Sequence, residues 1–256
     1  VILDFVANHV SNKHPAMLEA LKDRKAPTKK WFEWYTWPRY RSFYHVKSMP
    51  ELNLCFGSPA RAHLLEAAQY WLKRGVDGYR LDYAHGTGLD FWVDFRQACE
   101  EVNPECWTFG EVVTSAEEQA AFAGGMHGTL DFLSCQALRA SLAQQVWPLS
   151  KLAGYLEAYH AAFPEGFSRP SFIDNHDMNR FLYVAYNDPR LLEIALTLLY
   201  LMPGPPIVFA GTESLLSQHR SIHDEDSIGF DESRLPMNWE DLSGKKTVEF
   251  PSLSYL

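Results

Sequence analysis

Short apolar runs alternate with helical patterns along most of this chain, with roughly thirty residues in each strand-and-helix pair where the pattern is clearest. The runs at 1–6, 76–81 and 106–109 have the length and character of buried parallel strands. Strands and helices that alternate in this order predict βαβ units around a parallel sheet.

One helix between these strands carries clear signals at both ends. Ser58 and Pro59 are typical of a helix N-cap and first turn, and Gly75 marks the end. Its apolar residues recur at three-to-four spacing, which predicts one buried face. The same reasoning predicts helices at 89–102, 134–145, 150–162 and 189–202, and strands at 129–132, 171–173 and 206–209.

A barrel explains this series better than a nucleotide-binding sheet does, because no glycine-rich phosphate loop follows any predicted strand. Six strands are predicted, whereas a (β/α)₈ TIM barrel needs eight. We therefore expect a partial barrel, about strands 3 to 8. The chain begins inside a strand without Met, so we expect a piece of a larger protein, and residues 1–256 alone to be poorly soluble or inactive.

Residues 10–57 interrupt the alternation with many aromatic side chains among Lys and Arg. The stretch is too long for an ordinary connection, so we predict an inserted subdomain at 10–57. The predicted barrel then comprises 1–9 and 58–256. The aromatic residues of the insert suit either a small local core or a wall for a ligand.

Composition excludes several function classes. The net charge of −9 argues against non-specific nucleic-acid binding and is compatible with a neutral substrate. No apolar run approaches the roughly 18 to 20 residues of a membrane span. The spacing of the four cysteines fits no metal motif, so we predict free thiols. Cellular compartment and oligomeric state are left open.

Carboxylates follow the carboxyl ends of the predicted strands, where the active residues of a parallel barrel lie. Asp4 ends the first strand, Asp82 the second and Glu111 follows the third, while Asp174 and Asp177 follow a later one. Like charges gathered at one rim are costly, which indicates a functional site. His14, His127, Asp131 and the run 223–226 are interpreted as residues of solvated loops.

Strand alternation refines the prediction around Asp82. Arg80 and Asp82 are two residues apart and point to the same side, whereas Tyr79 and Leu81 face the helices. An Arg beside a carboxylate keeps it ionised and oriented, although Arg-x-Asp also occurs as a structural ion pair. A pair of carboxylates with opposite roles is the recurring solution for glycoside hydrolysis.

Four segments resemble, in order, the four conserved regions of the α-amylase family. They are Asp4-Phe5-Val6-Ala7-Asn8-His9, Gly78-Tyr79-Arg80-Leu81-Asp82, Phe109-Gly110-Glu111-Val112 and Phe172-Ile173-Asp174-Asn175-His176-Asp177. The resemblance implies a (β/α)₈ barrel with a subdomain inserted after its third strand, which the segment 10–57 fits. It also implies a retaining glycoside hydrolase that cleaves α-1,4-glucosidic bonds of malto-oligosaccharides or related α-glucans through a covalent glycosyl-enzyme.

The resemblance also implies a role for each matching residue. Asp82 is expected to be the nucleophile and Glu111 the general acid/base, while Asp177 stabilises the transition state. Expected to contact or support the substrate are His9, Arg80, His176, Asp4 and His85, with Arg80 positioning Asp82 and Asp4 a partner within the site.

The chain departs from the family pattern after the nucleophile. Many members carry Lys-His there, whereas this chain has His85 and Gly86. We therefore expect no cofactor, and Asn8 is the only residue that we name as a candidate calcium ligand. The run Met49-Pro50-Glu51-Leu52-Asn53 resembles the neopullulanase or cyclomaltodextrinase subgroup.

Two alternatives to hydrolysis stay open at this point. The same machinery supports transglycosylation or isomerisation, in which a sugar replaces water. A non-catalytic sugar-binding barrel is the other alternative, since fold does not determine function.

Overall fold

In the computed structural model, which describes residues 1–237 and 239, four strands form a parallel sheet in the order β1 (Ile2–Val6), β4 (Gly78–Asp82), β5 (Trp107–Gly110) and β6 (Gly128–Thr129). In the register Asp4 pairs with Arg80, and Leu81 with Gly110. The carboxyl ends of parallel strands meet at one edge, so Asp82 and the residue after Gly110 are brought to the same rim.

This sheet belongs to the first of two units, which consists of Val1–Leu130 and Tyr159–Pro170. The second consists of Asp131–Ala158 and the described residues from Ser171 onward.

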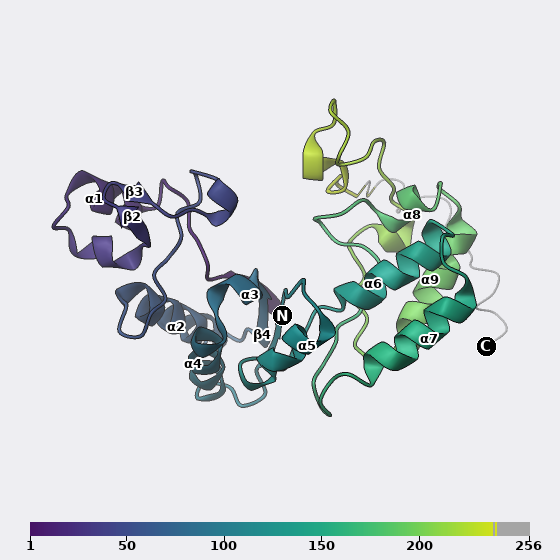
Figure 1. The fold of residues 1–256 in the computed structure, drawn as a ribbon, viewed down its shortest axis with the longest axis horizontal. Helices are drawn as coiled ribbons and strands as arrows, with labels where there is room; N and C mark the ends of the chain where they lie inside the picture. Colours follow the sequence, from purple (N-terminus) through teal and green to yellow (C-terminus); the bar gives the residue numbers. More distant parts are fainter. Residues whose placement is uncertain (238, 240–256) are drawn as a thin grey trace. The chain divides into compact units, whose positions relative to one another are not determined.

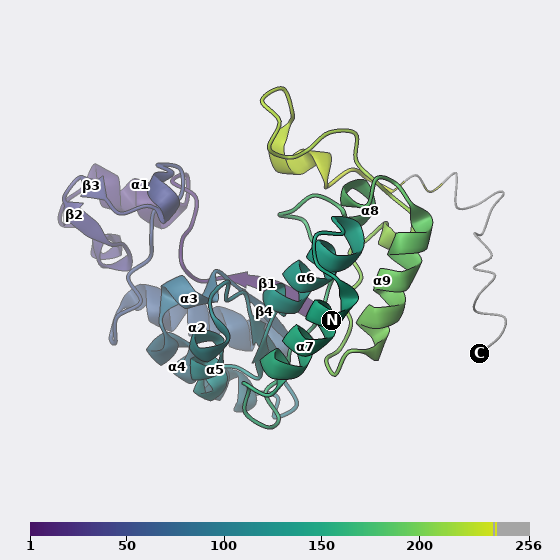
Figure 2. The same ribbon diagram turned by 45° about the vertical axis from the view of Figure 1, so that its right-hand side comes forward.

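Two helices cover one face of the sheet in the first unit (Figures 1 and 2). The helix α2 (Pro59–Leu72) begins as predicted, since the Ser58 side chain accepts the N–H of Ala60. Gly75 follows with φ +92°, a conformation that favours glycine. The helix α4 (Leu89–Glu100) packs against α2. Tyr79 and Leu81 are fully buried among these helices, as strand alternation predicts.

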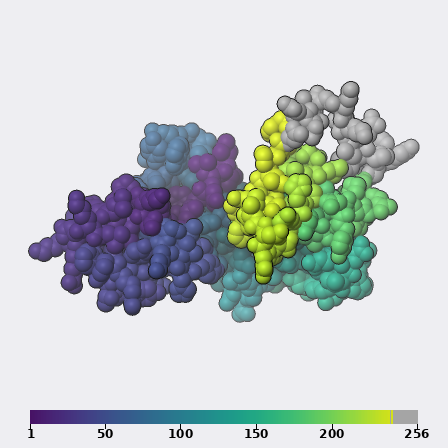
Figure 3. Space-filling view, turned by 90° about the horizontal axis from the view of Figure 1, so that it is seen from above, coloured from purple at the N-terminus to yellow at the C-terminus, as the bar shows by residue number. Residues whose placement is uncertain are grey.

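Shorter elements complete the first unit. They are α1 (Pro15–Lys22), η1 (Pro27–Trp31), β2 (Trp34–Thr36), β3 (Arg39–Tyr40), η2 (Phe43–His45), α3 (Ala84–Thr87), α5 (Ala116–Ala120) and η3 (Ala121–Gly124). Strands β2 and β3 form a separate antiparallel pair within the aromatic-rich segment. That segment has a small core that includes Met17, Phe32 and Leu52, and it forms the purple-to-blue mass in the space-filling view (Figure 3). Its status as an inserted subdomain stays a prediction.

Helices make up most of the second unit (Figures 1 and 2). They are α6 (Phe132–Leu138), the π-helical turn η4 (Arg139–Ala143), α7 (Leu149–His160), α8 (Phe181–Val184), α9 (Pro189–Leu201), η5 (Thr212–Ser214) and η6 (Gly229–Glu232). Leu138, Phe181, Ala195 and Leu199 are fully buried in the core of this unit. None of the helices in the described ranges combines the length and apolar character that a membrane crossing requires.

Three of the predicted strands differ from the observed structure. The segments 171–173 and 206–209 form only a single parallel bridge, between Ser171 and Pro206. Pro170, Pro205 and Pro206 have no N–H to donate to a ladder, which limits pairing there. The strand predicted at 129–132 ends at Thr129, because the Asp131 side chain accepts the N–H of Ser134 and caps α6.

All four cysteines are free thiols, as predicted. Cys55 is exposed, and the other three are buried.

Candidate active site

Arg80 holds three carboxylates together in the first unit. Its Nη1 lies 2.7 Å from Asp4 Oδ1 and 2.5 Å from Asp82 Oδ1, and its Nη2 lies 3.1 Å from Glu111 Oε2. The pairing of Asp4 with Arg80 across β1 and β4, and the two-residue step to Asp82, place these side chains on one side of the sheet. The structure therefore brings together four of the predicted site residues.

The charges of this cluster compensate for its burial. The Arg80 side chain is only 12% exposed, and burial by itself would lower its pKa. The carboxylates of Glu111, Asp4 and Asp82 outweigh burial, so the pKa of Arg80 lies above its ordinary value. One fixed guanidinium thus faces both proposed catalytic carboxylates, and its planar fork suits such contacts.

Main-chain hydrogen bonds fix the position of Glu111. Its N–H donates to Leu81 O over 2.8 Å, and its carbonyl accepts the N–H of Ala84 over 2.9 Å. Its side-chain Oε2 accepts the N–H of Tyr83 over 3.0 Å. Sequence reasoning missed this contribution of Tyr83, since a main-chain donor leaves no signal in residue type.

His9 lies in the same unit and is partly buried. Its ring stacks on Phe43 with centroids 4.5 Å apart. Burial lowers the pKa of His9, and the charges of Asp82 and Glu51 only partly oppose this effect. A neutral imidazole can both donate and accept a hydrogen bond, as a contact with sugar hydroxyls requires.

His85 packs against the ring of Tyr83, with centroids 4.4 Å apart. Its Nδ1 is buried and has no hydrogen-bond partner within the described residues. The predicted substrate contact of His85 stays a prediction.

Asp177 belongs to the second unit, where the side chains of Arg234 and His176 contact its carboxylate. Arg234 Nη2 lies 2.7 Å from Asp177 Oδ1, and His176 Nε2 lies 3.2 Å from Asp177 Oδ2. Arg234 also donates through Nε to His176 O over 2.8 Å. Sequence reasoning missed Arg234, which is distant in the chain. The approach of Asp177 to Asp82 and Glu111 stays a prediction.

Two other acidic residues have structural roles. Asp174 is 2% exposed and accepts the N–H of Phe181 over 2.8 Å at the start of α8, and burial raises its pKa. Asp131 is 1% exposed. Its interpretation as a solvated-loop residue is wrong, because its side chain caps α6 from inside the core. A single sequence position after a strand does not distinguish a buried cap from a loop residue.

The described residues around Asn8 do not form an evident metal centre. Asn8 lines a cavity of about 210 Å³ with Glu33, Glu51 and Asp90. Arg41 already forms an ion pair with Glu51 over 3.2 Å. Among residues 1–237 and 239, no three His, Cys, Asp or Glu side chains are grouped to hold an ion. Asn8 stays the only candidate calcium ligand that the sequence names.

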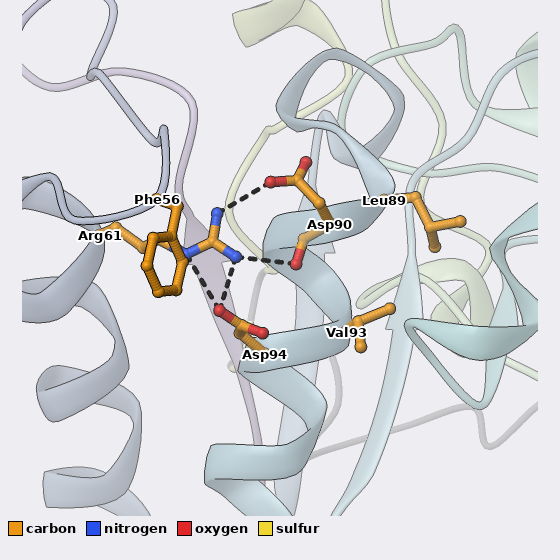
Figure 4. A pocket seen from close by; sticks show the side chains of 6 residues that line it. All are labelled: Phe56, Arg61, Leu89, Asp90, Val93 and Asp94. Atoms are coloured by element: carbon orange, nitrogen blue, oxygen red, sulfur yellow. Dashed lines mark hydrogen bonds and ion pairs between the residues drawn. The ribbon is translucent and has the colours of Figure 1, made fainter.

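The first unit also has a larger cavity, of about 680 Å³, which none of the predicted site residues lines. Arg61 lies at its base between the carboxylates of Asp90 and Asp94 (Figure 4). Phe56, Leu89 and Val93 complete its wall. We place the chemistry at the Arg80 cluster, because one guanidinium there contacts three carboxylates, two of them the proposed catalytic residues. At this cavity, Arg61 forms ion pairs with Asp90 and Asp94.

Comparisons with known proteins show similar sequences and a similar fold. A family model described as the catalytic domain of alpha amylase matches residues 37–250. Alpha-amylase 2 of Dictyoglomus thermophilum is 34% identical over 252 residues, which cover 98% of this chain and 44% of that protein. A cyclomaltodextrinase of a Bacillus species is 29% identical over 83% of this chain and 40% of that protein.

A solved structure of similar fold is the cyclic alpha-maltosyl-(1→6)-maltose hydrolase of Arthrobacter globiformis in complex with maltose. It has a TM-score of 0.83 and 26% identity over 93% of this chain and 55% of that one. This chain therefore spans about half the length of these relatives or less. The match confirms the predicted fold class, a partial (β/α)₈ barrel. The family model, which matches most of the sequence, confirms the predicted family: the chain belongs to the alpha-amylase family.

Proposed function

We propose that the protein is a retaining glycosidase that hydrolyses α-1,4-glucosidic bonds in malto-oligosaccharides or related α-glucans. The observation that carries the proposal is the single guanidinium of Arg80, which contacts both Asp82 and Glu111. Retaining enzymes need their two carboxyl groups only about 5–5.5 Å apart. Two carboxylates on adjacent nitrogens of one guanidinium support such a short separation.

Asp82 and Glu111 divide the reaction between them. A carboxylate oxygen of Asp82 attacks the anomeric carbon, the bond to the leaving oxygen breaks, and Glu111 gives that oxygen its proton. Water then attacks the glycosyl ester and gives a proton back to Glu111, which releases the sugar and regenerates Asp82. Arg80 orients Asp82 throughout, and the family resemblance assigns to Asp177 the stabilisation of the positive charge that develops on the sugar ring.

The relatives support the substrate class. The similar proteins include an alpha-amylase and a cyclomaltodextrinase, and the similar structure binds maltose. Such substrates are neutral polyols, so the net charge of −9 is compatible with binding them. His9 and His176 offer ring nitrogens to sugar hydroxyls.

The test uses the full-length protein with maltotriose and cyclomaltodextrin. Proton NMR of the first product should show the α-anomer, because two displacements at one carbon retain configuration. Asp82→Asn should lower kcat by at least about 10⁴-fold. An initial product in the β-configuration, or an active Asp82→Asn variant, would reject the mechanism. Predominant transfer products at high acceptor concentration would replace hydrolysis with transglycosylation.

A further inference from the structure

Gly86 lies directly beneath the aromatic ring of Tyr83. A Cβ atom at position 86 would lie 2.0 Å from Tyr83 Cε1 and 2.6 Å from Cδ1, and the three nearest atoms all belong to that ring. Such distances are far below van der Waals contact. Any side chain at position 86 must therefore displace Tyr83. This is the position where the family commonly carries His.

Three other rings contact the ring of Tyr83, which is partly buried. It makes edge contacts with Phe43 at 4.6 Å, Tyr44 at 5.5 Å and His85 at 4.4 Å between centroids. Burial, together with the hydrogen bond to Tyr44, raises the pKa of Tyr83 to about 12. These contacts restrict the ring on the sides that face Phe43 and His85, so we expect a methyl group at position 86 to strain the main chain of Tyr83 as well as to move its ring.

The main chain at Tyr83 is coupled to Glu111. Tyr83 has φ +44°, a left-handed conformation that is uncommon for a non-glycine residue, and in it the N–H points to Glu111 Oε2 over 3.0 Å. The next residue, Ala84, donates to Glu111 O over 2.9 Å and accepts the indole N–H of Trp92 over 2.8 Å. A displacement of Tyr83 therefore changes the contact that orients the Glu111 carboxyl group.

We propose that Tyr83 is a positioning residue for the general acid Glu111, and that Gly86 is present because only glycine leaves space for the ring that anchors it. This inference rests on the proposed function, in which Glu111 protonates the leaving oxygen. It predicts a defect confined to substrates whose leaving group needs that proton.

The test compares two substrates in the full-length protein. Maltotriose has a sugar leaving group that requires protonation, whereas α-maltosyl fluoride releases fluoride ion without it. Gly86→Ala should lower kcat/KM about 10- to 100-fold on maltotriose and less than about threefold on the fluoride, because kcat/KM reports the step in which the leaving group departs. Gly154→Ala is the matched control, since a Cβ there meets no atom within 4 Å.

A second set of variants separates positioning from folding. Tyr83→Phe keeps the ring and should retain kcat/KM on both substrates, while Tyr83→Ala should show the same selective loss as Gly86→Ala. Adding Gly86→Ala to Tyr83→Ala should cost less than about threefold more, because the ring that the methyl group would meet is gone.

Three results would overturn the inference. The first is an unchanged kcat/KM on maltotriose in both Gly86→Ala and Tyr83→Ala. The second is an equal loss of kcat/KM on the two substrates in the folded Tyr83→Ala variant. The third is a double variant in which the two losses of kcat/KM multiply. Failure of the proposed function gives a different result, because the unsubstituted protein would then cleave neither substrate or would stay active as Asp82→Asn.

Discussion

Nη2 of Arg80 lies 3.1 Å from Oε2 of Glu111, and that same oxygen accepts the main-chain N–H of Tyr83. The proposed general acid is thus held by one charged and one neutral donor. Through its other terminal nitrogen, Arg80 contacts Asp82, so it connects the two carboxylates that the mechanism requires to act in sequence.

Arg80→Lys should therefore impair catalysis more than substrate binding. An ammonium group is a single point charge and cannot contact Asp82 and Glu111 through two separate, fixed nitrogens. We expect kcat to fall about 100-fold or more with a change of less than about fivefold in KM. Steady-state kinetics on maltotriose measure both. Arg74→Lys is the control, because the Arg74 side chain contacts the carbonyl and the ring of Tyr70, which is not one of the predicted site residues. An Arg80→Lys variant with the kcat of the unsubstituted protein would contradict this role.

Arg234→Met should separate activity from stability. Arg234 and Asp177 are 41% and 39% exposed, and an exposed ion pair contributes at most about 1 kcal/mol to folding. Loss of the pair leaves the Asp177 carboxylate with its contact to His176 and with more freedom to rotate, so we expect kcat/KM to fall about tenfold. Thermal unfolding and steady-state kinetics are the measurements. Arg190→Met, which breaks the exposed pair with Asp188, should alter neither. Unchanged kcat/KM in Arg234→Met would remove Arg234 from the site.

Local sequence patterns predict the parts of this site that are close in the chain. Period-two alternation places Arg80 and Asp82 on one side of a strand, and capping residues mark the start of α2. Each prediction depends on residues only a few positions apart, and the structure confirms each of them.

Other features depend on tertiary register or on the main chain, which residue types do not encode. The pairing of Arg80 with Glu111 requires β4 and β5 to align, and Arg234 reaches Asp177 from 57 positions away. The left-handed turn at Tyr83 is unusual for an aromatic residue and has no sequence signal. Asp131 shows the converse, because a residue type typical of loops is a buried helix cap here.

His127 should make stability fall as the pH falls below neutrality. Its Nδ1 accepts the main-chain N–H of Thr108 over 3.1 Å, which requires an unprotonated nitrogen. Burial and, to a lesser extent, the charge of Arg96 lower the pKa of His127 below the ordinary value of 6.5, against the opposing charge of Glu100. The unfolded chain therefore binds the proton first. The contribution of neutral His127 is present above pH 6.5 and is lost as the pH falls through the lower folded-state pKa.

Melting temperatures measured between about pH 7.5 and pH 5 check this effect. The matched variant is His127→Asn, because the Asn carbonyl oxygen can accept the Thr108 N–H but does not titrate. The variant should lose less stability than the unsubstituted protein over this range. Burial also lowers the pKa of His9. Because His9 is present in both proteins, its effect on stability cancels in the difference between them. Identical slopes for the two proteins would show that His127 does not contribute.

Arg61→Leu should reduce stability and leave catalysis intact. The Arg61 side chain is 6% exposed and donates through Nη1 to Leu54 O over 2.8 Å and through Nη2 to Asp94 Oδ2 over 2.6 Å, so it joins α2 to the preceding loop and to α4 (Figure 4). Asp90 and Asp94 are exposed enough to be hydrated without Arg61, but the carbonyl of Leu54 loses its donor.

We expect Arg61→Leu to lower the free energy of unfolding by about 1–3 kcal/mol. Urea denaturation measures it, and Asp90→Asn should cost less than about 1 kcal/mol because the Asp90 side chain is 76% exposed. Since Arg61 contacts none of the proposed catalytic residues, kcat at 25 °C should match that of the unsubstituted protein. A large fall in kcat without loss of stability would instead connect the cavity at Arg61 to the reaction.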